Sequence, residues 1–413
     1  MTGSKDNAAP ENLPGERLHA LDAVRGFALL LGVAFHATGS FLPGPAHAPI
    51  WPVEDTQRSW VLAAVFFTTH AFRMTTFFLI AGFFAHMTFH RKGAASFIGD
   101  RLKRIGIPLV VGWPFMIVGI IAASLWGLVI ANGGVMPHGP SPAFPKFPAF
   151  PLTHLWFLYV LLELYAATLI LRGLVALIDR GGRLRAGLDR LVGALMRGPF
   201  AALVLAIPVA VVFAANPHWL MWFGIKTPDD SFVTNAQAIA GFGTAFGFGW
   251  LLNRQIDLLE ILRRRWVVNL GLAIAMLGVS WAIATPTLFS TPPEALHLVG
   301  AATYALAAWT TTFAAIGMAM QSLSGFSPAR RYIADASYWV YLAHLPIVLA
   351  LQAAVSQQDW PWPAKFAVVL GGALILCFGS YQLLVRHSFI GGVLNGPRPR
   401  KAKKAARLQT QTA

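Results

Sequence analysis

The chain consists mostly of long apolar stretches separated by short polar segments. A helix that crosses a membrane needs roughly 20 mostly apolar residues, and a hydropathy window of about that length finds about ten candidates here. The sequence therefore predicts an all-α, polytopic membrane protein with about ten transmembrane helices around a polar cleft. The predicted spans are 22–43, 60–89, 105–131, 153–177, 198–216, 236–253, 266–285, 297–323, 334–355 and 365–386.

Composition supports this prediction, because 56% of the 413 residues are hydrophobic and only 12% are charged. The pattern divides the chain into a polar N-terminal tail (1–21), a transmembrane domain (22–386) and a basic tail (387–413). The first segment has no apolar core or cleavage site of the secretory kind. The single cysteine, Cys377, excludes a disulfide within the chain and a Cys-based metal site. The glycines of 236–253 lower its helix propensity, although glycine is common where membrane helices pack closely.

The net charge of +15 is better explained by topology than by nucleic acid. If both termini are cytoplasmic, the outer loops hold few basic residues, of which Arg58, Lys146 and Lys226 are the clear cases. This asymmetry follows the positive-inside rule and predicts an even number of spans. The basic tail then fits an anchor on anionic headgroups or a site for a specific partner. The inner basic residues include Arg91, Lys92, Arg101, Lys103, Arg104, Arg180, Arg183, Arg185, Arg190, Arg197, Arg254, Arg263, Arg264, Arg265, Arg330 and Arg331.

The first span carries ionisable residues that an ordinary membrane anchor does not need. Arg25 and His36 are eleven positions apart, which leaves them about 20° from alignment on a helix and about 16 Å apart along its axis. His36 is therefore expected near mid-depth and Arg25 near the cytoplasmic surface. Asp22 shares this face and can hold the Arg25 guanidinium. A snorkelling arginine and a hydrogen-bonded structural histidine are the alternative interpretation.

Other buried polar groups lie in the second, fourth and ninth spans. His70 and Arg73 share one helix face, and Arg73 needs an acidic partner or a water-filled cavity. Glu163 is the buried acid at comparable depth, so we predict an Arg73–Glu163 pair. Tyr341 and His344 form one stripe of the ninth span, where a packing histidine and a catalytic one both fit.

The third span begins with Arg101 and Arg104, which lie one turn apart. Such a pair suits bidentate hydrogen bonds to phosphate oxygens, although any positive-inside loop supplies similar pairs. The twelve histidines are scattered along the chain without the paired spacing of metal ligands. We therefore predict no metal site.

Together these residues resemble the acyltransferase-3 family of integral membrane enzymes, over essentially all predicted helices. The family signature of an Arg followed eleven positions later by a His matches Arg25 and His36, and its Arg-x-x-Arg matches Arg101 and Arg104. The chain is most similar to a glucan-modifying subgroup, through the runs HAFRMTTFFLIAGFF, RIGIPL, HLWFL and YLAHLP. Ala81 departs from the serine that the family usually has before Gly-Phe, so no role of that hydroxyl is carried over.

The resemblance implies acyl transfer from cytoplasmic acyl-CoA to a carbohydrate hydroxyl at or beyond a bacterial inner membrane. For the subgroup it implies a succinyl group, a periplasmic glucan and glucan-synthesis proteins as partners. No bound cofactor is expected, since succinyl-CoA or acetyl-CoA is a substrate. A transporter or flippase for a small solute or glycan is the competing interpretation, and a non-catalytic anchor for a glycan-synthesis complex is a third.

This interpretation gives each candidate residue a role. His36 would act as general base, while Arg25, held by Asp22, would orient the donor or counter developing charge. Arg101 and Arg104 would hold the CoA phosphates. A free carboxylate on a succinyl group would need a cation, which Arg73 or Arg25 could supply. The expected cleft residues are His70, Arg73, Glu163, His154, Trp156, Tyr341 and His344.

Overall fold

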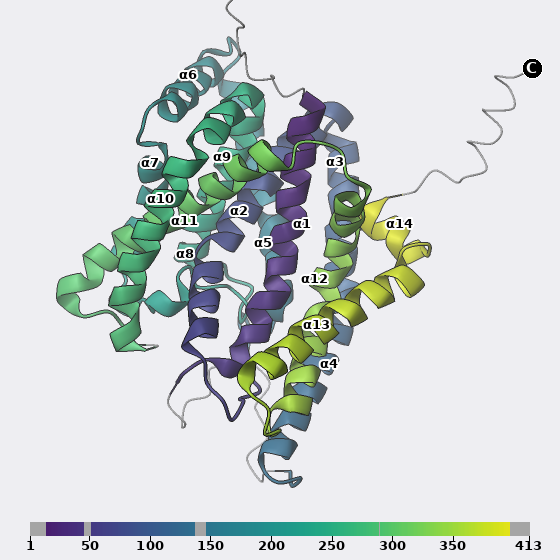
Figure 1. Ribbon diagram of the computed structural model, residues 1–413. Coiled ribbons are helices and arrows are strands. Elements are labelled where there is room, and N and C mark those ends of the chain that lie inside the picture. The colour runs from purple at the N-terminus through teal and green to yellow at the C-terminus, as the bar shows by residue number, and fades with distance from the viewer. Residues whose placement is uncertain (1–13, 45–50, 137–145, 289, 397–413) are drawn as a thin grey trace, which may run out of the picture.

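The computed structural model describes residues 14–44, 51–136, 146–288 and 290–396. Within these ranges the chain is a bundle of helices without β-strands, apart from an isolated bridge between Ala149 and Ser231 (Figure 1). The predicted all-α membrane fold is confirmed. Residues 1–13 and 397–413 of the predicted tails lie outside the described residues. The helices are α1 Pro14–Thr38, α2 Trp60–Lys92, α3 Ala94–Arg101, α4 Ile107–Ala131, α5 Trp156–Ile178, α6 Arg183–Arg197, α7 Ala201–Ala214, α8 Ala236–Ala238, α9 Thr244–Leu252, α10 Leu259–Ala284, α11 Glu294–Ser322, α12 Pro328–Val355, α13 Trp362–Ser380 and α14 Phe389–Asn395.

In the described chain, eight helices are long and apolar enough to cross a membrane, or nine if the bent pair α6 and α7 forms one span. The predicted span 198–216 is too long, because α7 has only 14 residues and meets α6 at 107°. One of the eight, Ala236–Thr287, has 52 residues, or about 78 Å of helix, more than twice a hydrocarbon core of roughly 30 Å. It contains two predicted spans, 236–253 and 266–285, on either side of the non-helical residue Gln255.

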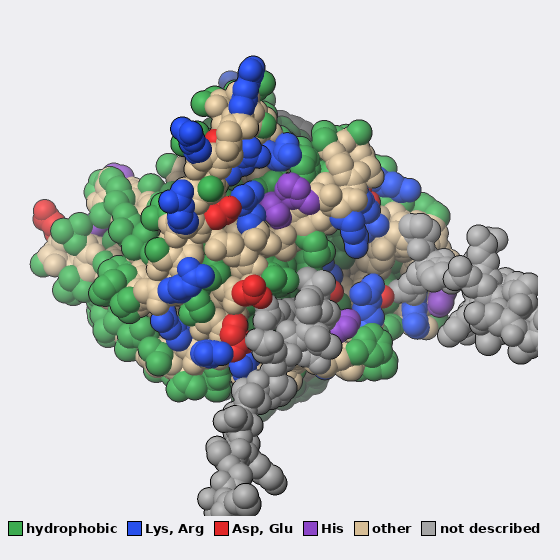
Figure 2. All heavy atoms as spheres, turned by 90° about the horizontal axis from the view of Figure 1, so that it is seen from above, with side chains coloured by type: hydrophobic (Ala, Val, Ile, Leu, Met, Phe, Trp, Pro, Cys, Tyr) green, Lys and Arg blue, Asp and Glu red, His purple; other side chains and the backbone are tan. Residues whose placement is uncertain are grey.

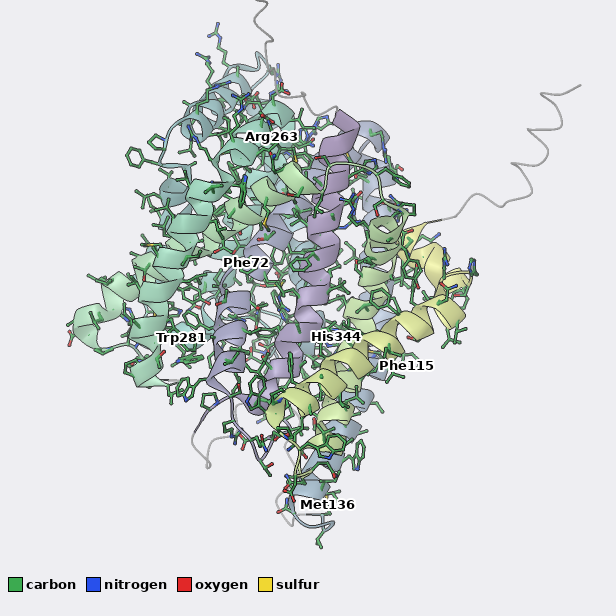
Figure 3. The ribbon with its side chains drawn as sticks, in the orientation of Figure 1. Phe72, Phe115, Met136, Arg263, Trp281 and His344 are labelled. Atoms are coloured by element: carbon green, nitrogen blue, oxygen red, sulfur yellow. The ribbon has the colours of Figure 1, made fainter. Side chains whose placement is uncertain are left out.

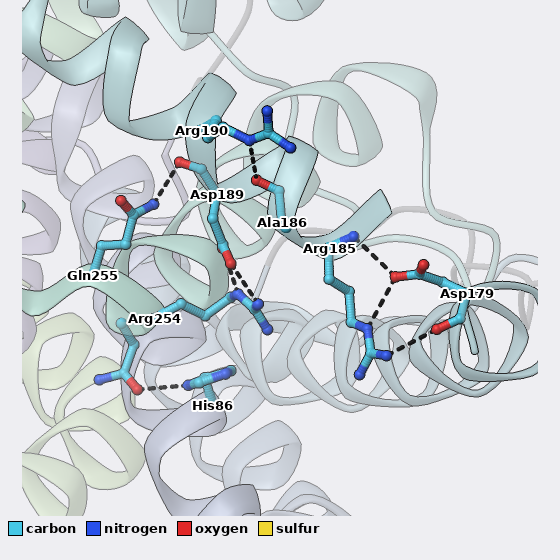
Figure 4. A network of polar contacts seen from close by, with 9 residues as sticks. His86, Asp179, Arg185, Ala186, Asp189, Arg190, Arg254 and Gln255 are labelled. Carbon is cyan, nitrogen blue, oxygen red and sulfur yellow. Dashed lines mark hydrogen bonds and ion pairs between the residues drawn. The ribbon is translucent and has the colours of Figure 1, made fainter. Parts of the chain in front are cut away.

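A polar network explains the break at Gln255 and holds α6 in place (Figure 4). The Gln255 side chain donates to the Asp189 carbonyl oxygen at 2.8 Å, and Arg254 donates to both Asp189 carboxylate oxygens at 2.6 and 2.7 Å. At the start of α6, Asp179 accepts from the backbone N–H groups of Leu184 and Arg185. These bonds, led by that from Arg185, hold the pKa of Asp179 below its ordinary value. The network therefore fixes α6 across the ends of its neighbours.

The glycine-rich segment around α9 packs directly on α2. A methyl group added at Gly82 would overlap the Phe246 carbonyl oxygen, and one at Gly249 would overlap the Leu79 carbonyl oxygen. The two backbones therefore approach as closely as small residues allow in membrane helices. This contact explains why a segment of low helix propensity is nevertheless a helix.

Basic side chains gather at one end of the molecule, which we call the basic end. Figure 2 shows Lys and Arg side chains spread over this end, with apolar side chains around its margin. In Figure 3, Arg263 lies at the basic end, Met136 at the opposite end, and His344 between them. Phe115 is 69% exposed on the side of α4, as expected for a lipid-facing surface. The arrangement agrees with the predicted asymmetry, whereas the cytoplasmic location of the basic end stays a prediction.

Helix α1 packs against α2, α11, α12 and α13 and leaves one face, which carries the 62% exposed Phe27, uncovered (Figure 1). It starts at the basic end and runs toward the opposite end. The face that carries Arg25 and His36 is therefore enclosed by other helices, which places both side chains beside internal cavities.

Candidate active site

Two adjoining cavities lie along α1. The basic chamber has a volume of about 550 Å³ and is lined by Asp22, Arg25, Asp100, Arg101 and Arg104, among others. The histidine chamber, of about 370 Å³, is lined by four histidines among the described residues. Leu29, Phe77 and Phe157 line both chambers. The structure thus provides a cavity at each end of the Arg25–His36 face, with three apolar side chains where they meet.

The basic chamber carries more positive than negative charge. Of the described side chains that line it, six are basic and three are acidic, which favours an anionic ligand. Asp22 binds Arg25 at 3.0 Å, as their shared helix face predicts. Asp100, which the sequence interpretation did not consider, contacts Arg104 at 3.1 Å and Arg101 at 3.9 Å. The two arginines therefore face the same cavity but share one carboxylate.

His36 lies near the end of α1, and its ring stacks on Trp51 of the following loop. The ring centroids of these two residues are 5.4 Å apart in a stacked arrangement. Gln352 accepts from Trp51 Nε1 at 2.8 Å and donates to the carbonyl oxygens of His36 and Ala37 at 3.0 and 3.2 Å. It thereby satisfies two carbonyls at the end of α1, which a helix leaves without partners. The His36 ring also lies 5.1 Å from the His344 ring.

Backbone carbonyls fix the proton position on the other three histidines of this chamber. His70 Nε2 donates to Phe223 O at 2.5 Å, His154 Nε2 to Leu342 O at 3.0 Å, and His344 Nδ1 to Tyr341 O at 2.7 Å. A carbonyl only accepts, so each of these nitrogens carries a proton. Within the described residues, neither ring nitrogen of His36 has a hydrogen bond, and its Nδ1 is buried. His70 Nδ1 and His344 Nε2 are also buried without a partner, so His36 differs from these two rings only in having neither nitrogen engaged.

Arg73 is a buried cation in the same chamber. Its side chain is 9% exposed, its guanidinium lies 4.6 Å from the Phe35 ring centroid, and its Nε has no hydrogen-bond partner. In the described part of the chain no carboxylate forms an ion pair with it. A buried arginine is costly unless something pairs with it, so this position suits an anionic ligand group.

The predicted Arg73–Glu163 pair is wrong. Glu163 accepts a hydrogen bond from Thr234 Oγ1 at 2.5 Å and is absent from the lining of both chambers. The physical reason is helix geometry: Leu161 faces the basic chamber, and Glu163, two positions later, points about 200° away from it. Glu163 therefore contacts the loop between α7 and α8 instead of lining either chamber.

The remaining predicted cleft residues do come together. His70, His154, Trp156, Tyr341 and His344 all line the histidine chamber. The Tyr341 hydroxyl donates to the His154 carbonyl oxygen at 2.8 Å, which ties α12 to the start of α5. Within the described ranges, no group of three or more His, Cys, Asp or Glu side chains is placed to hold a metal ion.

The sequence interpretation missed the loop residues of the chamber. Trp51, Thr153, Thr227 and Asp229 also line it. Trp51, Thr227 and Asp229 lie in loops, where no periodicity marks which side chains face inward, and Thr153 begins the short 3-10 helix that precedes α5. Only their contacts in the folded chain identify them.

Comparisons with known proteins agree with this geometry. The acyltransferase-3 profile, described as an acyltransferase domain, matches residues 18–382. Glucans biosynthesis protein C of Salmonella paratyphi B and of Salmonella heidelberg are each 34% identical over 105 residues, which span 25% of this chain and 26% of theirs. No solved structure matches the chain significantly. Because the family profile covers most of its length, the chain belongs to the acyltransferase-3 family and is a membrane acyltransferase.

Proposed function

We propose that this acyltransferase moves an acyl group from cytoplasmic acyl-CoA to a carbohydrate hydroxyl on the other side of a bacterial inner membrane. The observation that carries the proposal is the adjacency of the basic chamber and the histidine chamber, which share Leu29, Phe77 and Phe157. The basic end and both termini would then face the cytoplasm, in keeping with the positive-inside rule.

The two chambers suit the two ends of the donor. CoA carries several phosphate charges and cannot cross hydrocarbon, so its phosphates would stay in the basic chamber near Arg101 and Arg104. The slim acyl-pantetheine arm would pass Leu29, Phe77 and Phe157 and place the thioester beside His36. The acceptor would enter the histidine chamber from the opposite end.

His36 would act as the general base. The neutral imidazole takes the proton from the attacking hydroxyl as its oxygen bonds to the thioester carbonyl carbon. When the C–S bond then breaks, the CoA thiolate leaves and receives that proton from the imidazolium. The ester remains on the carbohydrate, so atoms and charge balance without a bound cofactor. Arg25, held by Asp22 at 3.0 Å, would orient the donor in the basic chamber.

Replacing Arg101 and Arg104 together with glutamine should raise the KM for acyl-CoA by about 10- to 100-fold, because each loses charge-assisted hydrogen bonds to phosphate. The kcat should change little, since neither residue lies in the histidine chamber. Initial rates across acyl-CoA concentrations measure both constants. Arg264→Gln is the matched control, as Arg264 belongs to the same basic end and its side chain is 75% exposed. A KM within twofold of the parent value would contradict the assignment.

We further propose that the acyl group is succinyl and the acceptor a periplasmic glucan. Arg73 supports the first part, because it is a buried cation without a carboxylate partner among the described residues. The free carboxylate of a succinyl group would supply that partner. The second part rests on the names of the two relatives and on the resemblance of this chain to them.

Arg73→Gln should lower the ratio of kcat/KM for succinyl-CoA to that for acetyl-CoA by about 10- to 100-fold. The variant removes an unpaired buried charge, so folded protein is expected. Competition between the two donors in one reaction measures the ratio directly, and Arg264→Gln, whose side chain is 75% exposed, serves as control. An equal loss with both donors would mean that Arg73 does not recognise the carboxylate.

The deciding experiment uses the purified full-length protein in nanodiscs with labelled succinyl-CoA or acetyl-CoA and neutral gluco-oligosaccharides. Mass spectrometry detects the new ester, and parallel proteoliposomes report flux of the same oligosaccharide. Ester formation without flux supports the proposal. Flux without ester would overturn it in favour of a transporter.

A further inference from the structure

The loops at the outer mouth of the histidine chamber present a distinct set of side chains. Trp51 and Pro52 come from the loop between α1 and α2, Thr153 from the segment before α5, and Thr227 and Asp229 from the loop between α7 and α8. Among the described residues that line this chamber, Asp229 has the only carboxylate. The chamber therefore carries a cation, Arg73, deep inside and a carboxylate at its entrance.

The segment that carries Asp229 is braced by its neighbours. The backbone N–H of Thr153 donates to the Asp229 carbonyl oxygen at 3.0 Å, and that of Phe150 to Asp230 O at 2.9 Å. The Phe150 and Phe232 rings stack with centroids 4.4 Å apart. On the other side, Thr234 binds Glu163 of α5. These contacts give the Asp229 backbone a defined position against the start of α5.

The Asp229 carboxylate is oriented but not neutralised. Thr227 Oγ1 donates to its Oδ1 at 3.0 Å. Lys226 contacts the next residue, Asp230, at 3.7 Å, and in the described part of the chain no basic side chain forms an ion pair with Asp229. A carboxylate is an acceptor with two oxygens, and its hydrogen bonds to neutral donors are charge-assisted. It is thus suited to a ligand that offers several hydroxyl donors.

We propose that Asp229, supported by Thr227 and Thr153, forms an acceptor subsite that binds neighbouring hydroxyl groups of an uncharged saccharide. The proposal rests on the proposed function and names the class of its acceptor. The saccharide hydroxyls donate to the carboxylate, and an apolar sugar face packs against Trp51 or Pro52, as amphipathic ligands do on aromatic surfaces. The negative charge disfavours acceptors that carry carboxylates of their own.

Asp229→Asn should raise the KM for a neutral gluco-oligosaccharide by about tenfold or more, because a charge-assisted acceptor becomes a neutral amide. The KM for acyl-CoA and the slow hydrolysis of the thioester without acceptor should stay unchanged. The ratio of kcat/KM for the neutral oligosaccharide to that for an oligosaccharide that carries a carboxylate should also fall. Asp230→Asn is the matched control, because this neighbour lines neither chamber and its exposed pair with Lys226 contributes little.

Calorimetric titration of the oligosaccharide alone separates this proposal from the proposed function. Weaker binding to Asp229→Asn than to the parent and to Asp230→Asn supports the subsite, even if no protein forms ester, in which case the transferase proposal alone fails. Equal binding by all three, or no binding by the parent, overturns the subsite. A shift in both the donor and the acceptor KM would also overturn it, since that result indicates a general disturbance of the chamber.

Discussion

Replacing His36 with alanine is expected to lower the rate of acyl transfer by about 10²- to 10⁴-fold, the usual contribution of a general base. The protein should remain folded and still bind acyl-CoA, because the proposed phosphate contacts lie in the other chamber. His36 is chosen because it shares the helix face of Arg25 and because no hydrogen bond in the described residues occupies its ring. A backbone carbonyl fixes the proton on His70, His154 and His344, although His70 Nδ1 and His344 Nε2 are also without a partner.

Two measurements distinguish a loss of chemistry from a loss of folding in His36→Ala. Size-exclusion profiles and acyl-CoA binding test whether the variant is folded, and ester formation tests the chemistry. His297→Gln is a suitable control, because His297 is a half-buried histidine of α11 that donates to the Phe213 carbonyl oxygen and lines neither chamber. Undiminished transfer by His36→Ala would refute the base assignment.

The second large effect concerns stability and comes from a buried ion pair between α13 and the loop that precedes α2. Lys365 of α13 donates to Asp55 Oδ1 at 2.8 Å, and the two side chains are 0% and 1% exposed. Lys365 also donates to the Ser356 carbonyl oxygen at 3.1 Å. Removing one member leaves the other charge buried without a partner, so Lys365→Met should cost about 3–5 kcal/mol of unfolding free energy. Thermal unfolding in detergent should shift downward by roughly 5 °C or more.

The double variant distinguishes a pair from two independent contacts. Asp55→Asn combined with Lys365→Met should recover most of the loss, because the asparagine oxygen can still accept from the Gln57 backbone N–H, now at 2.8 Å. Glu54→Gln in the same loop is the control: its pair with Arg58 is about one-third exposed and should contribute less than about 1 kcal/mol. If the loss of unfolding free energy in the double variant equals the sum of the losses in the two single variants, Asp55 and Lys365 do not hold the loop as a pair. Because this loop carries Trp51, the single variants should also lose transfer activity.

The lengths of the apolar stretches in the sequence are enough to predict much of the fold. The predicted spans 236–253 and 266–285 contain α9 and most of α10, and the segment between them includes Gln255, where the helix breaks. The span 198–216 was overestimated, because an apolar stretch does not reveal that α6 and α7 meet at a sharp bend. Close contact through Gly82 and Gly249 is equally invisible in a single sequence, which shows glycines but not their partners.

The candidate site was predictable where one helix carries the pattern. Counting 100° per residue placed Arg25 and His36 on one face, and Leu29 and Gly32 between them do line the chambers. Contacts between helices were not predictable in this way. Glu163 has a depth that suits Arg73 but lies on the wrong face of α5, and Asp229 belongs to a loop without periodicity.

The apolar side chains of Leu29, Phe77 and Phe157 lie where the two chambers meet, so they affect whether water can form a continuous path across the membrane. An uninterrupted column of water from one face to the other would let protons flow down their gradient and dissipate the membrane potential. Apolar constrictions exclude water and thereby block ions. We therefore expect Leu29, Phe77 and Phe157 to close around the acyl arm of the proposed donor. Acyl transfer between the two chambers would then not dissipate the membrane potential.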